Sequence, residues 1–194
     1  MTDHRGAALI DLVAATALTV VLAAIAVPVA GGTLERERAI MGAQYLAGQL
    51  QRARLESLRR GQSVAVHVRI EGDRAACQLF VDANGNGVLQ RDIDRGVDPA
   101  LAPETWLDEQ ARAVTLRINQ AITDVGGSTT LVAGDDPVRI GSSSLVSFSP
   151  QGGATSGTLY VAASKGPQMA VRIFGATGRV RTLVFDAPTR QWHP

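Results

Sequence analysis

An apolar segment near the N-terminus limits what this chain can fold into more than any other feature. From Leu12 to Leu34 no residue carries a charge, and Asp11 lies directly before this run. A helix of that length spans about 34 Å, more than the ~30 Å thickness of a bilayer's hydrocarbon core. We therefore expect a membrane-spanning helix. A carboxylate at the edge of such a helix needs a partner to offset the cost of its burial.

Three interpretations of this N-terminal segment are open. A secretory signal peptide would end in the small-residue site Ala24-Ile25-Ala26 and leave a chain that starts at Val27, although Asp11 weakens this interpretation. A simple single-span anchor is the second interpretation. The third rests on Gly6 and the residues after it, Ala7-Ala8-Leu9-Ile10-Asp11. This stretch resembles the class III leader of type IV pilins and type II secretion pseudopilins.

The resemblance to pilins implies a route of processing and assembly. In that family a prepilin peptidase cuts after the glycine, here Gly6, and the new N-terminus, here Ala7, is usually methylated. Ala7 and Asp11 stand where the family usually has an aromatic residue and a glutamate. The resemblance implies that Asp11 neutralises the N-terminal amino group of an adjacent subunit in the filament. It also implies that Pro28 permits a bend in the anchor helix.

Beyond the anchor, the residue pattern predicts a long helix and then strands. Apolar residues recur every three or four positions up to about residue 53, and Gly61 is a natural helix end. From Val64 the pattern alternates with period two, which predicts a half-buried strand with His67 pointing to solvent. Residues 120–143 are expected to form a long loop. Further strands are expected at 77–81, 113–119, 144–148, 158–163, 169–174 and 179–185.

These elements predict an α+β fold, with a long N-terminal transmembrane helix followed by a β-rich globular domain of two sheets. We expect residues 1–6 to form a leader and residues 7–61 to form the helix. About 7–34 would lie in the membrane, and 62–194 would form the globular domain.

The C-terminal third resembles the GspH/FimT minor pseudopilins. Val146–Gly152 carries a Phe-Ser-Pro-Gln-Gly turn, Gly157–Val161 forms a glycine-led strand, and Gly175–Arg181 contains a closing hairpin with Thr-Gly-Arg. Gly178 would supply the positive φ that a tight hairpin turn requires. The resemblance implies a structural subunit of a type II secretion pseudopilus or a type IV pilus. Its partners would be other pilin or pseudopilin subunits, the prepilin peptidase and the bacterial inner membrane, which it would cross once with its domain in the periplasm.

A short loop after the second predicted strand is a candidate calcium site. Oxygen ligands at alternate positions before Gly87 are typical of loops that wrap a hard cation. Ile93 stands where such a loop would close with an acidic residue, and two aspartates flank it. The candidate ligands are Asp82, Asn84, Asn86, Asp92 and Asp94. The alternative for this segment is a simple Asn-Gly turn. A structural calcium would also suit an exported or anchored β-domain without a filament role.

Arg179 and Arg181 are spaced to point to the same side of a strand. Their Gly-Arg-x-Arg arrangement resembles one in FimT-type pilins that take up DNA, and two such guanidiniums could bind phosphates. The alternative is that both are exposed residues of a hairpin typical of the family.

The sequence has no Gly-x-Ser-x-Gly motif, no phosphate-binding loop and no His/Cys spacing for a metal. We therefore predict a non-enzymatic protein that requires no cofactor, with calcium as an optional structural ion.

Overall fold

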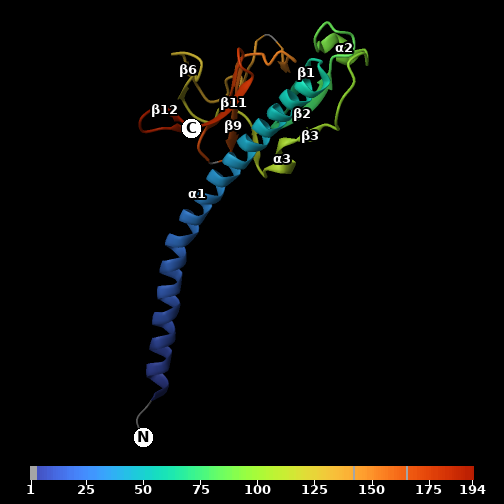
Figure 1. The fold of residues 1–194 in the computed structure, drawn as a ribbon. Coiled ribbons are helices and arrows are strands. Elements are labelled where there is room, and N and C mark those ends of the chain that lie inside the picture. Colours follow the sequence, from blue (N-terminus) through green and yellow to red (C-terminus); the bar gives the residue numbers. More distant parts are fainter. Residues whose placement is uncertain (1–3, 142, 165) are drawn as a thin grey trace.

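The computed structural model describes residues 4–141, 143–164 and 166–194 (Figure 1). Its longest element is α1 (His4–Arg60), which projects from the globular domain at its N-terminal end and lies against the sheets at its C-terminal end. Gly61 ends the helix with a φ of 67°, as the sequence predicts, and its N–H donates to the Ser57 carbonyl at 3.0 Å. Within the described residues, no helix combines the length and the apolar character needed to cross a membrane.

The first sheet follows α1 in the chain and has the strand order β3-β2-β1-β8. Its strands are β1 (Val64–Glu71), β2 (Arg74–Val81), β3 (Thr105–Trp106) and β8 (Leu145–Phe148). β1 and β2 form a hairpin in which Glu71 lies opposite Arg74. Two short helices, α2 (Gln90–Asp94) and α3 (Leu107–Gln110), lie in the connections around this sheet.

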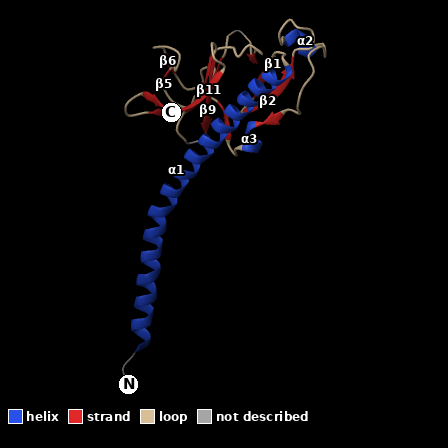
Figure 2. Cartoon of the chain, viewed as in Figure 1, coloured by secondary structure: helices blue, strands red, loops and turns tan. Residues whose placement is uncertain are grey.

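The second sheet contains most of the C-terminal strands and has the order β12-β11-β10-β9-β4, with β7 also paired to β9. Figure 2 shows its strands beside α1, with the first sheet farther along the same helix. The strands are β4 (Val114–Leu116), β7 (Val138–Arg139), β9 (Gly157–Ala163), β10 (Met169–Phe174), β11 (Arg179–Asp186) and β12 (Gln191–His193).

The last third of α1 forms part of the hydrophobic core. Ala39, Ala43, Leu46, Leu50 and Ala53 are fully buried and recur at the three- and four-residue spacing of one helix face. This face packs against apolar side chains of both sheets in one continuous cluster. The sequence pattern therefore predicts correctly which side of the helix faces the domain.

β1 differs from the predicted half-buried strand because both of its faces are covered at its start. Ala65 is fully buried and packs with Phe80 and Val88, so the segment that contains α2 covers the outer face. His67 is half-buried, and its ring lies 6.2 Å from the ring of Phe80. The expectation that His67 points to solvent is therefore wrong, because alternation along one strand cannot reveal a distant segment that covers it.

The segment 120–143, expected to be a loop, contains short strands. β5 (Ile122–Thr123) and β6 (Thr130–Leu131) form a small third sheet, and β7 joins the second sheet. The Tyr160 hydroxyl donates to Asp124 Oδ1 at 2.6 Å, and Trp192 Nε1 donates to the Thr123 carbonyl at 2.6 Å. These bonds attach the β5–β6 hairpin to β9 and β12.

Candidate functional site

The residues predicted to act in processing and assembly all lie in α1. Gly6, Ala7, Asp11 and Pro28 fall within its bounds, and the Asp11 side chain is exposed. Residues 1–3 of the predicted leader lie outside the described residues. The exposed Asp11 carboxylate thus lies on the projecting part of the helix, where a second molecule or lipid can contact it.

The candidate calcium loop is organised by the buried carboxylate of Asp82, which is 4% exposed. Its Oδ1 accepts hydrogen bonds from the Asn84 and Gly85 N–H groups at 3.2 and 2.7 Å. Its Oδ2 accepts one from the Gly87 N–H at 2.8 Å. Gly85 and Gly87 have φ values of 79° and 86°, which favour glycine and let the backbone turn around the carboxylate.

Two further buried carboxylates hold the same segment. Asp92 Oδ2 accepts from Asn86 Nδ2 at 3.0 Å, and this bond lowers the pKa of Asp92 below its ordinary value. Asp98, which is 1% exposed, accepts from the Ala83 and Leu89 N–H groups at 3.1 and 3.3 Å. Asp82, Asp92 and Asp98 therefore satisfy polar groups along the whole segment 82–98.

Asp94 stands apart from the other predicted calcium ligands. Its side chain is exposed, and its Oδ1 accepts from Gln90 Nε2 at 2.8 Å. The part of the chain that the structure describes contains no group of three or more His, Cys, Asp or Glu side chains placed to hold a metal ion. Calcium binding stays a prediction from the sequence.

Arg179 and Arg181 begin β11 with exposed side chains, while Val180 between them packs on the core. The two guanidiniums therefore leave the same side of the strand. Arg181 lies opposite Arg172 of β10, whose Nη1 donates to Thr158 Oγ1 at 2.9 Å. Among the described residues, neither Arg179 nor Arg181 has a carboxylate within ion-pair distance.

A groove of about 560 Å³ runs between α1 and the start of β11. We call it the α1–β11 groove. It is lined by Gln44, Ala47, Gly48, Gln51, Arg179, Val180, Arg181, Thr182 and Pro194. A second hollow of about 500 Å³ adjoins the same arginines and includes Arg54. The buried Nε atom of Arg54 has no hydrogen-bond partner among the described residues.

The family model described as "Type II transport protein GspH" matches residues 42–178. The chain belongs to the GspH family. The match begins in the part of α1 that packs on the domain and ends at Gly178, so it contains the segment 82–98 and stops just before Arg179. No curated protein and no solved structure matches the chain. GspH-family members are pseudopilin-like components of type II secretion rather than a family of enzymes.

Two residues of this GspH-family domain escaped prediction from the sequence. Asp98 is as important to the segment 82–98 as Asp82, but it lies far along the chain from the Asp-Asn-Gly pattern. Arg54 looks like one of several polar-face arginines of α1, yet it lies against the turn at Gly178. Gly178 itself has a φ of 60°, as predicted. The roles of Asp98 and Arg54 become visible only in the folded structure, where segments distant in the sequence lie together.

His67 should make the stability of the GspH-family domain depend on pH. Burial lowers the pKa of His67 below its ordinary value, and the nearby Arg69 adds to this effect, while Asp94 and Glu104 oppose it. The unfolded chain therefore binds a proton first, and the free energy of unfolding should fall as the pH drops below about 6.5.

The measurement is urea unfolding of the full chain at pH 7.5 and 5.5, a range in which carboxylates contribute little. Exchanging His67→Gln should reduce the difference between the free energies of unfolding at the two pH values. If the variant keeps the entire pH dependence of the original chain, His67 is not its source.

Proposed function

We propose that the chain is a minor pseudopilin that joins a filament of the type II secretion or type IV pilus kind through α1. Membership of the GspH family supports this role. The filament would be based in the bacterial inner membrane, with the globular domain in the periplasm. The protein would contribute structure and recognition rather than turnover of a substrate.

The observation that carries this proposal is the projecting part of α1, which leaves large apolar side chains uncovered. Each of them is more than half exposed: Leu12, Val13, Leu18, Val20, Val21 and Leu22. Exposed apolar surface of this kind needs a lipid or protein partner. The membrane would cover this surface before assembly, and the helices of neighbouring subunits would cover it in the filament.

Asp11 gives this packing its specificity in the proposal. Cleavage after Gly6 would leave a positively charged amino group on Ala7, one helical turn from the Asp11 carboxylate of the same chain. In an apolar bundle of helices, the carboxylate of one subunit would offset the charge of its neighbour's N-terminus.

Exchanging Asp11→Ala should leave membrane insertion unchanged and reduce filament incorporation by about tenfold or more, the loss expected when one partner of a buried ion pair is removed. Insertion is measured by alkaline extraction of membranes, and incorporation by the amount of the chain recovered with sheared or crosslinked filaments. Asp11→Glu is the matched control and should assemble. Assembly of Asp11→Ala at the original level would show that the assigned role is wrong.

The mature N-terminus tests the proposal independently of Asp11. Mass spectrometry should find a chain that starts at methylated Ala7. A chain that starts at Val27 would identify a secretory signal peptide and overturn the filament proposal.

DNA binding by Arg179 and Arg181 is a second candidate function, favoured by the exposure of both side chains and by the lack of an acidic partner for either in the described part of the chain. A FimT-like pilin for DNA uptake would use them to bind phosphates, and its binding would weaken steeply with salt. A gel-shift titration at low and high salt, repeated with both arginines exchanged for alanine, tests this function.

A further inference from the structure

The first five residues of β11 form an open sheet edge. β12 pairs only with Val184–Asp186 of β11. From Arg179 to Leu183, β11 is paired with β10 on one side, and no described strand pairs with it on the other. Alternate residues of an antiparallel edge strand direct their N–H and C=O groups outward, so this stretch is a template for one more strand.

The α1–β11 groove runs along this open edge, so a strand added there would not lie in open solvent. Its helical wall consists of Gln44, Ala47, Gly48 and Gln51. No atom lies within 4 Å of the position that a Cβ on Gly48 would occupy. Small residues on the helix therefore leave room between α1 and the edge of β11 for an extended backbone with small side chains.

The positive charge of β11 indicates which side chains the added strand should carry on the face that it shares with Arg179 and Arg181. Arg179 and Arg181 lie on the face of β11 opposite to Val180, which packs on the core, and both line the groove. Neither has an acidic partner among the described residues. Residues directly opposite in neighbouring strands share a face of the sheet. Acidic side chains two positions apart on an incoming strand would thus stand beside the two guanidiniums.

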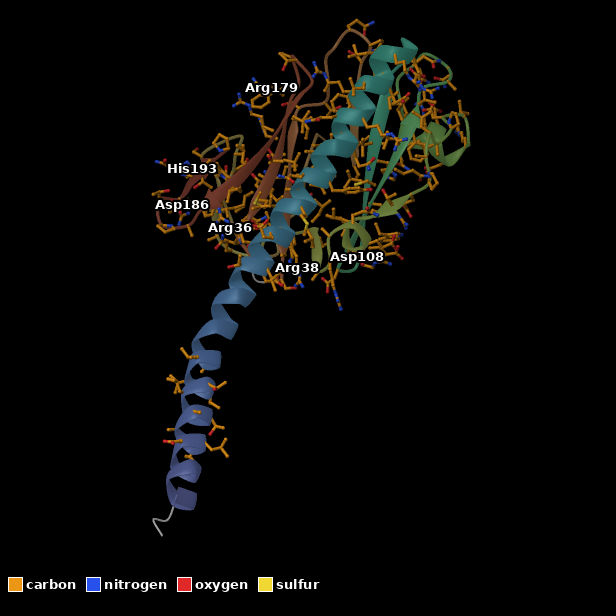
Figure 3. All side chains as sticks on the ribbon, turned by 60° about the horizontal axis from the view of Figure 1, so that its bottom comes forward. Arg36, Arg38, Asp108, Arg179, Asp186 and His193 are labelled. Atoms are coloured by element: carbon orange, nitrogen blue, oxygen red, sulfur yellow. The ribbon has the colours of Figure 1, made fainter. Side chains whose placement is uncertain are left out.

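Figure 3 shows Arg179 near one end of β11, while Asp186 lies toward its other end. Asp186 accepts a hydrogen bond from the Thr189 hydroxyl, so it is held at the closed end of the strand. The open end of β11 is therefore basic and the end capped by β12 carries the acid. This asymmetry favours an acidic strand over the long, uniformly basic track that a DNA duplex requires.

We propose that the α1–β11 groove binds an extended strand of a neighbouring filament subunit by β-augmentation, a strand in which acidic residues alternate with small apolar ones. Backbone bonds to Arg179–Leu183 supply affinity. The acidic residues pair with Arg179 and Arg181, and the apolar residues lie over Ala47 and Gly48. The identity of the partner as a filament subunit rests on the proposed function, but the groove and its chemistry do not.

The test uses the full chain in detergent micelles and a capped seven-residue peptide in which glutamate alternates with valine. Binding is followed by fluorescence anisotropy, and its location by hydrogen exchange of the backbone amides in β11. The peptide should slow exchange between Val180 and Leu183. A peptide with N-methyl groups on alternate amides, or with lysine in place of glutamate, should bind about tenfold more weakly or worse.

Two protein variants separate the contributions of the groove and of the charges. Gly48→Leu fills the groove and keeps both arginines, and no atom lies within 4 Å of the position that its Cβ would occupy. Arg179→Glu combined with Arg181→Glu reverses the charge and keeps the groove. Each variant should weaken binding of the glutamate peptide by about tenfold or more.

Equal binding of the N-methylated peptide would overturn the proposal. A chain that binds duplex DNA but not the glutamate peptide would also overturn it, because the two arginines would then bind nucleic acid. Self-association of the chain alone that protects the same amides would make a second copy the partner and would likewise overturn it. The incorporation assay with Asp11→Ala does not involve β11, so failure of the filament proposal is distinguishable from failure of this one.

Discussion

Exchanging Asp82→Ala should lower the free energy of unfolding by about 2–4 kcal/mol, because three backbone N–H groups lose a charged acceptor at once. The Asp82 carboxylate is buried, and among the described residues these three amides donate to Asp82 alone. Urea unfolding of the full chain measures the change. The turns at Gly85 and Gly87 should open first, which hydrogen exchange of their amides would detect.

Asp94→Ala is the matched control, since Asp94 is an exposed aspartate of the same segment whose side chain accepts from Gln90. It should cost less than about 0.5 kcal/mol, the usual range for surface substitutions. Equal effects of the two exchanges would contradict the assignment of Asp82 as the organising group of the segment.

The same pair of variants tests the predicted calcium site. A calcium ion held by the folded loop would raise the Tm of the original chain by mass action, and Asp82→Ala would abolish the rise. An original chain whose Tm does not change with millimolar calcium shows that the sequence prediction of this site is wrong.

Exchanging Gly157→Ala should cost about 3 kcal/mol, at the upper end of the range for overpacking a core position. A Cβ on Gly157 would overlap the Ile140 side chain and would lie 2.5 Å from the Arg139 carbonyl oxygen. Both neighbours belong to the β7 region that pairs with the start of β9, and Ile140 is 1% exposed. Neither can move without separating two strands of the second sheet.

Gly153→Ala is the control for this exchange, because the nearest atoms to its Cβ position lie at ordinary contact distances of 3.4 and 3.6 Å. Thermal unfolding should separate the two variants clearly, with Gly153→Ala within about 1 kcal/mol of the original chain. If Gly157→Ala is equally mild, the close approach of β7 to β9 is not required for stability.

Elements with a strong local period were predicted well from the sequence. The end of α1 at Arg60 and the long strands β1, β9, β10 and β11 agree with the predicted ranges to within about two residues. The α1 stripe and the hairpin at Gly178 depend on residues close together in the chain. Such features can be predicted because the helix or turn determines them locally.

The short strands and the outer face of β1 could not be predicted. β3, β5, β6, β7 and β12 have at most three residues each, so no period can develop. β3 pairs with β2 where Trp106 lies opposite Ala76, and Ala65 is buried because Val88 and Ile93 of the segment that contains α2 pack over it. These contacts join residues far apart in the sequence. The hydrogen bonds of Asp98 to the Ala83 and Leu89 N–H groups could not be predicted for the same reason.

α1 also determines how mechanical load would pass through the molecule. Its 57 residues make one continuous helix about 86 Å long along its axis, and from Ala39 onward one face of this helix packs on the core. The helix is unbroken between the two parts, although it bends along its length (Figure 1), so a pull or twist applied near Asp11 would pass along α1 to both sheets. Inserting one residue near Thr33 would turn the whole domain by about 100° around the helix axis, and would carry the open edge of β11 to another side of the filament.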